Sequence, residues 1–175
     1  IGTGMGKDGD GHAPTIGPWG PGGQGNPRDI FRGRNPMTRL KTATLNGGNA
    51  RSEQAVALGL AWLARHQADD GHWSFHDFCA HGKCNCAGTG AQNDVAATAL
   101  ALLAFEGAGE THRGVAGSTK YAKNVERGLR WLLRRQGTDG RFGDGYAHAI
   151  ATLALCEAYG MTSDPLYRAP AQRAI

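Results

Sequence analysis

The part of this sequence best suited to chemistry is a stretch rich in cysteine and histidine, residues 74–92. It holds four soft or borderline metal ligands within eight positions: Cys79, His81, Cys84 and Cys86. Zinc takes such groups in a tetrahedron, and three cysteines with one histidine are a known structural set. The spacing C-x-H-x₂-C-x-C is not that of the common zinc fingers, so zinc is one of two interpretations of this stretch.

The other interpretation is a disulfide. Cys84 and Cys86 are too close in the chain to bond easily to each other. A bond from Cys79 to either of them would leave one thiol over unless Cys156 is within reach. A disulfide would favour an extracytoplasmic location, because such bonds persist in oxidising compartments. The sequence alone leaves the metal, the disulfide and the compartment open.

The elements that must position this stretch are helices, and they repeat. Residues 56–73 and 125–142 align without a gap at an offset of 69 and share one helix face and the turn after it. In the first copy Val56, Leu60 and Leu63 lie at i, i+4 and i+7, which is one face of a helix. The pattern predicts one amphipathic outer helix in each copy.

A second helix is expected after each outer helix. Residues 94–106 and 146–159 are apolar on nearly all sides, which is typical of buried helices. Their offset is 51, so the first unit carries an 18-residue insertion, around residues 74–92. The fold class predicted is therefore all-α, built from pairs of outer and inner helices. The expected units are residues 51–119, residues 120–169 and the start of a third unit at residues 170–175.

The turn between the two helices of each unit has its own motif. It comprises Gln67, Gly71 and Trp73 in the first copy and Gln136, Gly140 and Phe142 in the second. A glutamine side chain can satisfy unpaired backbone groups at a helix end, and glycine permits a close approach of another segment. We therefore interpret these six residues as structural.

This motif resembles the QW motif of the triterpene cyclases and the related repeats of protein prenyltransferase β-subunits. More closely, the chain looks like the bacterial proteins described as prenyltransferase/squalene oxidase repeat proteins. The resemblance covers residues 51–175. It implies an α/α toroid, a ring of helical hairpins of which this chain would hold an incomplete part. As partners it implies the remaining repeats, in a longer chain or in another protein, and an apolar ligand.

The catalytic motifs of those families carry over only weakly. The Asp-x-Asp-Asp acid of the cyclases is missing from this sequence. The prenyltransferases bind zinc through an Asp-x-Cys motif at the start of one inner helix and a histidine at the start of a later one. Here Asp94 opens the first inner helix, but Ala96 stands in place of the cysteine. His148 opens the second inner helix. Asp94 and His148 are therefore the weak catalytic candidates. The expected function is a non-catalytic repeat scaffold or binding protein; the alternative is a prenyltransferase- or squalene-cyclase-like enzyme with its active residues outside this segment.

The first 50 residues differ in composition from the rest. They contain 13 of the 28 glycines and five of the seven prolines. We expect residues 1–50 to be a largely irregular, flexible linker, with short order only around residues 30–31 and 37–40, because glycine is entropically costly to order and proline interrupts helices and sheets. Residues 51–175 are nearly neutral, which argues against a nucleic-acid partner, and no apolar run reaches the length of a membrane span.

Overall fold

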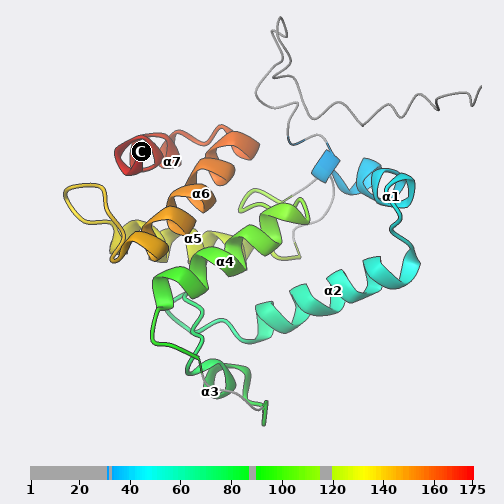
Figure 1. The fold of residues 1–175 in the computed structure, drawn as a ribbon, viewed down its shortest axis with the longest axis horizontal. Helices are drawn as coiled ribbons and strands as arrows, with labels where there is room; N and C mark the ends of the chain where they lie inside the picture. Colours follow the sequence, from blue (N-terminus) through cyan, green and yellow to red (C-terminus); the bar gives the residue numbers. More distant parts are fainter. Residues whose placement is uncertain (1–30, 32, 87–89, 115–119) are drawn as a thin grey trace, which may run out of the picture.

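A computed structural model describes residues 31, 33–86, 90–114 and 120–175 of the chain. Every regular element in these ranges is a helix, so the all-α prediction is confirmed (Figure 1). The helices are α1 (Pro36–Leu45), α2 (Ala50–Arg65), α3 (Phe78–Gly82), α4 (Asp94–Gly107), α5 (Ala122–Arg135), α6 (Gly145–Thr162) and α7 (Pro165–Ala174).

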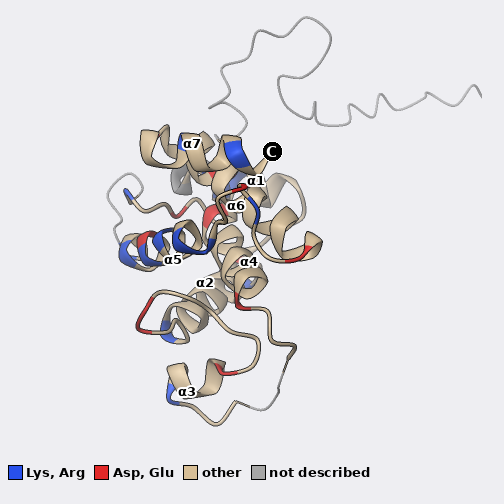
Figure 2. Ribbon diagram, turned by 90° about the vertical axis from the view of Figure 1, so that its left-hand side faces the viewer, with Lys and Arg blue, Asp and Glu red and all other residues tan. Residues whose placement is uncertain are grey.

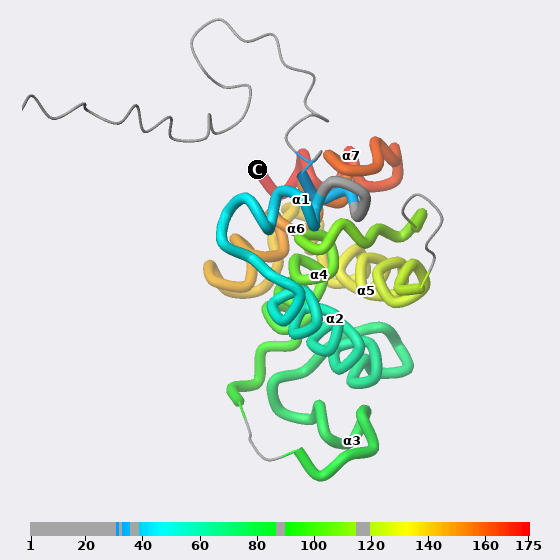
Figure 3. Tube along the Cα trace, turned by 90° about the vertical axis from the view of Figure 1, so that its right-hand side faces the viewer, coloured from blue at the N-terminus to red at the C-terminus, as the bar shows by residue number. Residues whose placement is uncertain are grey.

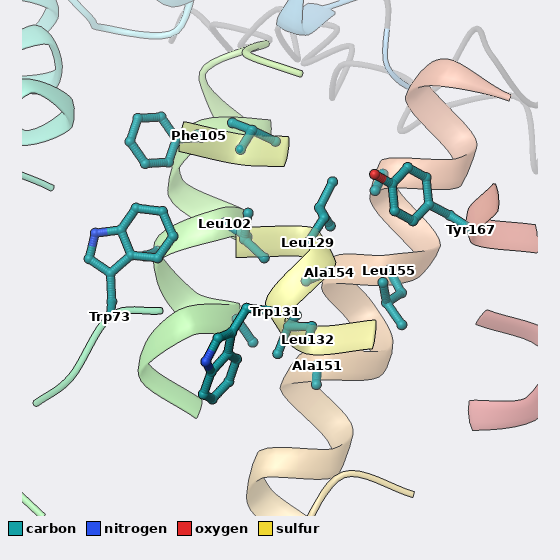
Figure 4. Packing of buried hydrophobic residues seen from close by; sticks show 14 of the residues in the cluster. Trp73, Leu102, Phe105, Leu129, Trp131, Leu132, Ala151, Ala154, Leu155 and Tyr167 are labelled. Atoms are coloured by element: carbon teal, nitrogen blue, oxygen red, sulfur yellow. The ribbon is translucent and has the colours of Figure 1, made fainter. Parts of the chain in front are cut away.

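The two apolar helices, α4 and α6, lie side by side at the centre of the fold, with α5 packed on α4 and α7 packed on α6. Their shared core is built from large side chains on all four helices (Figure 4). Leu102, Leu129 and Leu155 are fully buried in it, and Tyr167 closes it from α7. Short polar caps begin the central helices: Asn93 accepts a hydrogen bond from Ala96 N, and Asp144 accepts one from Ala147 N.

The two turns make equivalent contacts. Gln67 Nε2 donates to Gly71 O (2.8 Å) and to Asn124 O (2.9 Å). Gln136 Nε2 donates to Gly140 O (2.9 Å) and to Pro170 O (2.9 Å). Each glutamine therefore closes its own turn and joins it to the next outer helix, α5 or α7.

The first turn is also held by α5, along which lysine and arginine residues are concentrated (Figure 2). Arg127 donates to the carbonyl oxygens of Ala68 and Asp69, and Arg134 donates to that of Asp70. These hydrogen bonds attach α5 to the turn after α2, although the outer side of α5 has little apolar surface.

Helix α1 lies inside the stretch that we expected to be largely irregular. The segment Pro36–Leu45 has no glycine, and it starts with a proline at the first helical position, where the ring favours a helix. Arg39 then anchors it, donating to Glu53 Oε2 (2.5 Å) and Ala108 O (3.1 Å). The expectation for residues 1–30 and for residue 32 falls outside the described residues.

Helix α7 also differs from its expected start. It begins at Pro165, capped by Asp164, rather than near residue 170. Pro170 lies inside the helix, and its carbonyl oxygen accepts a hydrogen bond from Gln136. In the first unit, the carbonyl oxygen of Asn124 accepts the equivalent hydrogen bond from Gln67. Proline at residue 165 is again at the first helical position, where its missing N–H leaves no backbone bond unmade.

Glu106, in the last turn of α4, is almost completely buried, and neither of its carboxyl oxygens has a hydrogen-bond partner in the described part of the chain. Its counterpart in the second unit, Glu157, forms a two-point ion pair with Arg34 (2.5 and 3.1 Å). Burial raises the pKa of Glu106 well above its usual value, the negative charge of Glu157 raises it further, and Arg34 opposes the rise.

We expect Glu106→Gln to raise the free energy of unfolding at neutral and alkaline pH. Above the unfolded pKa of about 4.3 the native state keeps a proton that the unfolded chain releases, so the stability of the wild type falls as pH rises. Glutamine removes this loss, which is about 1.4 kcal/mol for each unit by which the pKa is raised. Urea unfolding near pH 4 and near pH 8 measures it. An equal difference between the proteins at both pH values would contradict this account of Glu106.

Candidate metal centre

The cysteine-rich insertion extends from the core at the end of the molecule away from α7, beside the C-terminal end of α2 (Figure 3). Its short helix α3 ends at Lys83 in the left-handed conformation (φ 48°), which turns the chain back toward α2. Gly82 lies against the ring of His66, so closely that any β-carbon at residue 82 would overlap the imidazole. The turn and the glycine together bring the segment after α3 onto the end of α2.

Three metal-ligating side chains meet at this contact. His66 Nε2 lies 3.0 Å from Cys84 Sγ and 3.8 Å from Cys86 Sγ, and the two sulfurs are 2.8 Å apart. The three ligand atoms lie within 4.8 Å of one another, close enough to hold one metal ion. His66 is completely buried, and both cysteines are half-buried.

The orientation of His66 prepares its ring for this role. Its Nδ1 lies 2.7 Å from the carbonyl oxygen of Trp62. A carbonyl oxygen can only accept a hydrogen bond, so Nδ1 carries the proton and the lone pair of Nε2 is directed at the cysteines. The ring is stacked on that of Trp62, with centroids 3.8 Å apart. Protein metal sites commonly orient a ligating histidine through such a second hydrogen bond.

The structure brings together two of the four predicted ligands. Cys84 and Cys86 are in the group, whereas Cys79 and His81 are not. Cys79 Sγ donates instead to Cys86 O (2.5 Å), and the His81 ring lies edge-on to His72 with centroids 5.4 Å apart. The short helix α3 is the reason, because it separates residues 79 and 81 from the two cysteines after its end.

His66 is the candidate ligand that sequence reasoning missed. It precedes the insertion and sits at the end of an outer helix, where a cation is expected for electrostatic reasons. One signal could have identified it: the equivalent position in the second unit, which has no insertion, is Arg135. A histidine in the one unit that carries the cysteines is therefore informative.

All four cysteines lie in described residues and are free thiols. The disulfide interpretation is therefore not realised in this structure, and the proximity of the group favours metal binding. Cys156 lies apart on α6, where burial and the nearby charge of Glu157 raise the pKa of its thiol.

The two weak catalytic candidates lie outside this group. Asp94 opens α4, and its Oδ2 is 3.9 Å from His72 Nε2. His72 Nδ1 lies 2.5 Å from Asp70 Oδ1. Burial by itself would raise the pKa of Asp70, but the hydrogen bonds from His72 outweigh this effect, and the pKa of Asp70 is lowered. His148, in the first turn of α6, accepts a hydrogen bond from Phe142 N at Nδ1 (3.3 Å). These contacts join each residue to its own turn.

None of the helices in the described ranges combines the length and the apolar composition that a membrane crossing needs. No family model, no curated protein and no solved structure matches this chain, so the site is interpreted from its own geometry.

Proposed function

We propose that this chain is a non-catalytic helical-repeat scaffold of the α/α-toroid type. It binds further helical units through the open face of its inner helix α6. Those units belong to a longer chain or to another protein. Its cysteine-rich insertion is held against α2 by a zinc ion.

One observation carries the scaffold proposal: equivalent positions on the two inner helices differ in exposure. Leu102 of α4 is fully buried, whereas its counterpart Leu153, 51 residues later, is 50% exposed. On the opposite face the order is reversed, because Leu100 is 40% exposed and its counterpart Ala151 is fully buried. Each helix covers one face of the other, so each is left with one open apolar face.

The repeat itself indicates what fits these faces. The face of α4 that carries Leu102 is covered by an inner helix, α6, and by α5. The same face of α6 borders a groove of about 490 Å³. Leu153, Cys156 and Tyr159 of α6 line it, and Phe31 and the Arg34–Glu157 ion pair form the rest of its wall with Gly160. Burying one leucine stabilises an interface by about 1.5–3 kcal/mol, and repeat proteins gain much of their stability from such contacts between neighbouring units. A further inner helix is therefore the occupant that matches the surface.

The donor set supports zinc as the ion of the metal centre. Two thiolates and one imidazole suit zinc, whereas calcium and magnesium require oxygen ligands. Cys79 lies beside the group, through its bond to Cys86 O, as a third thiol of the same insertion. Zinc supplies no reaction in this proposal; it crosslinks the insertion to the end of α2, which the short helix α3 cannot secure by itself.

Association of the chain tests the scaffold proposal, because a second copy offers a unit of the same kind. We expect sedimentation velocity to show concentration-dependent association that Leu153→Glu weakens at least tenfold, since one exposed leucine is worth more than about 1.4 kcal/mol in such a contact. Leu45→Glu is the matched control, because Leu45 is 76% exposed on α1, away from both faces. A chain that stays monomeric, or that Leu45→Glu affects equally, would refute the proposal.

A further inference from the structure

An apolar cavity of about 470 Å³ lies between the end of α2, the insertion and α4. Its aromatic walls are Trp62, Trp73, Phe75 and Phe78, and Leu100 of α4 forms the opposite side. Pockets for small organic molecules usually have volumes of about 300–1,000 Å³ and mostly apolar walls. The cavity therefore has the size and the lining of a ligand site.

The cavity belongs to the first unit alone. In the second unit the residues equivalent to Trp62 and Leu100 are Trp131 and Ala151, and both are buried; the Trp131 ring is stacked on His72 of the first turn. Phe75 and Phe78 come from the insertion and have no counterpart there. The insertion thus adds two aromatic walls to a face of α4 that would otherwise be open.

The polar groups at the cavity define the chemical class of the ligand. None of the residues that line it is charged. Trp73 Nε1 already donates to Leu63 O (2.7 Å), and Ser74 Oγ accepts from the backbone N–H groups of His76 and Asp77. A charged ligand would lose its hydration without gaining a partner, so the cavity fits an uncharged aromatic or hydrocarbon molecule.

The metal centre shares walls with this cavity. Trp62 lines the cavity and is stacked on the metal-ligating ring of His66. Phe78, whose ring centroid is 5.7 Å from that of Trp62, belongs to α3, just before Cys84 and Cys86. A metal ion that joins these cysteines to His66 would therefore hold both aromatic walls in place.

We propose that this cavity binds an uncharged, flat apolar ligand and that a metal ion at His66, Cys84 and Cys86 raises the affinity. The coupling rests on the proposed zinc site, whereas the cavity stands on its own geometry. Two ligands that order the same walls must strengthen each other by the same factor.

The neutral fluorophore N-phenyl-1-naphthylamine is a suitable probe, read by its own emission and by energy transfer from tryptophan. We expect one probe to bind per zinc-loaded chain, with affinity that falls roughly tenfold on chelation and returns with zinc, within the usual range of coupling between sites. Leu100→Arg should abolish binding, because it places a charge in the cavity. Leu166→Arg is the matched control, because Leu166 is a 49% exposed leucine on α7 that lines neither this cavity nor the groove beside Leu153, and it should leave binding unchanged. Circular dichroism checks the fold of both variants.

The outcomes separate the two proposals. Equal affinity for the probe with and without bound zinc would overturn the coupling while leaving the zinc site intact. A chain that takes up no zinc would overturn the zinc site and the coupling together. The two leucine variants would still test whether the cavity binds the probe. Loss of binding in Leu166→Arg but not in Leu100→Arg would overturn the assignment of the cavity.

Discussion

Removal of the proposed zinc ion, or replacement of one of its three proposed ligands, is expected to lower the free energy of unfolding by about 4 kcal/mol when the free metal exceeds its dissociation constant a thousandfold. His66, Cys84 and Cys86 lie close enough to hold a metal ion only in the folded chain. A metal bound there would therefore have far less affinity for the unfolded chain. Thermal and urea unfolding of zinc-loaded and chelated protein measure the change, and elemental analysis should find one zinc per chain.

A spectroscopic readout separates metal binding from packing, because His66→Ala also removes a buried ring that is stacked on Trp62. Cobalt(II) in a tetrahedral site with thiolate ligands gives charge-transfer and d–d absorption bands. We expect these bands in the wild type and their loss or marked change in Cys84→Ser and Cys86→Ser. His81→Ala is the matched control, a histidine of the same insertion outside the group. Intact bands in both serine variants would refute the assignment.

Gly140→Ala is expected to lower the free energy of unfolding by about 3 kcal/mol or more. Gly140 has a φ of 85°, in the left-handed region, which costs other residues about 1–2 kcal/mol. A β-carbon there would also collide with the carbonyl oxygen of Arg173 on α7, and such overpacking adds about 1–3 kcal/mol. The substitution therefore separates the second turn from the helix that Gln136 joins to it.

Gly59→Ala is the control for this prediction. Gly59 lies within α2, and a β-carbon there would meet no atom within 4 Å. Alanine favours a helix over glycine by about 0.5–1 kcal/mol, so this variant should be more stable than the wild type. Urea unfolding followed by circular dichroism compares the two. Similar free energies of unfolding for both variants would show that close packing at the turn does not require glycine.

Sequence patterns predicted the helices well where the signal is local. The apolar spacing of α5 and the all-round apolar character of α4 and α6 depend on neighbouring residues only, so they could be recognised without a structure. The full length of helix α1 was not expected, because one of its anchors is remote: Arg39 contacts Ala108, which lies 69 residues later. The start of α7 at Pro165 was missed because a proline there marks a helix start as well as a break.

The candidate site shows the same division. The cysteines drew attention to the insertion because their side chains bind metals wherever they lie, and Cys84 and Cys86 are close in the chain. Whether His66 or His81 lies beside the two cysteines depends on the direction of the chain after α3 and on which histidine ring that segment contacts. The spacing of residues in the sequence contains no such information. In the same way, nothing local distinguishes the buried Leu102 from the exposed Leu153.

By itself, the sequence determined the helical class, the paired helices, the glutamine turns and the presence of an insertion rich in cysteine and histidine. All of these follow from side-chain chemistry and from periodicity over a few residues. The tertiary structure alone decided which histidine joins the cysteines, which apolar faces stay open and where the segment around α1 docks. Those depend on contacts between segments far apart in the chain, whose free energies arise only when the helices pack.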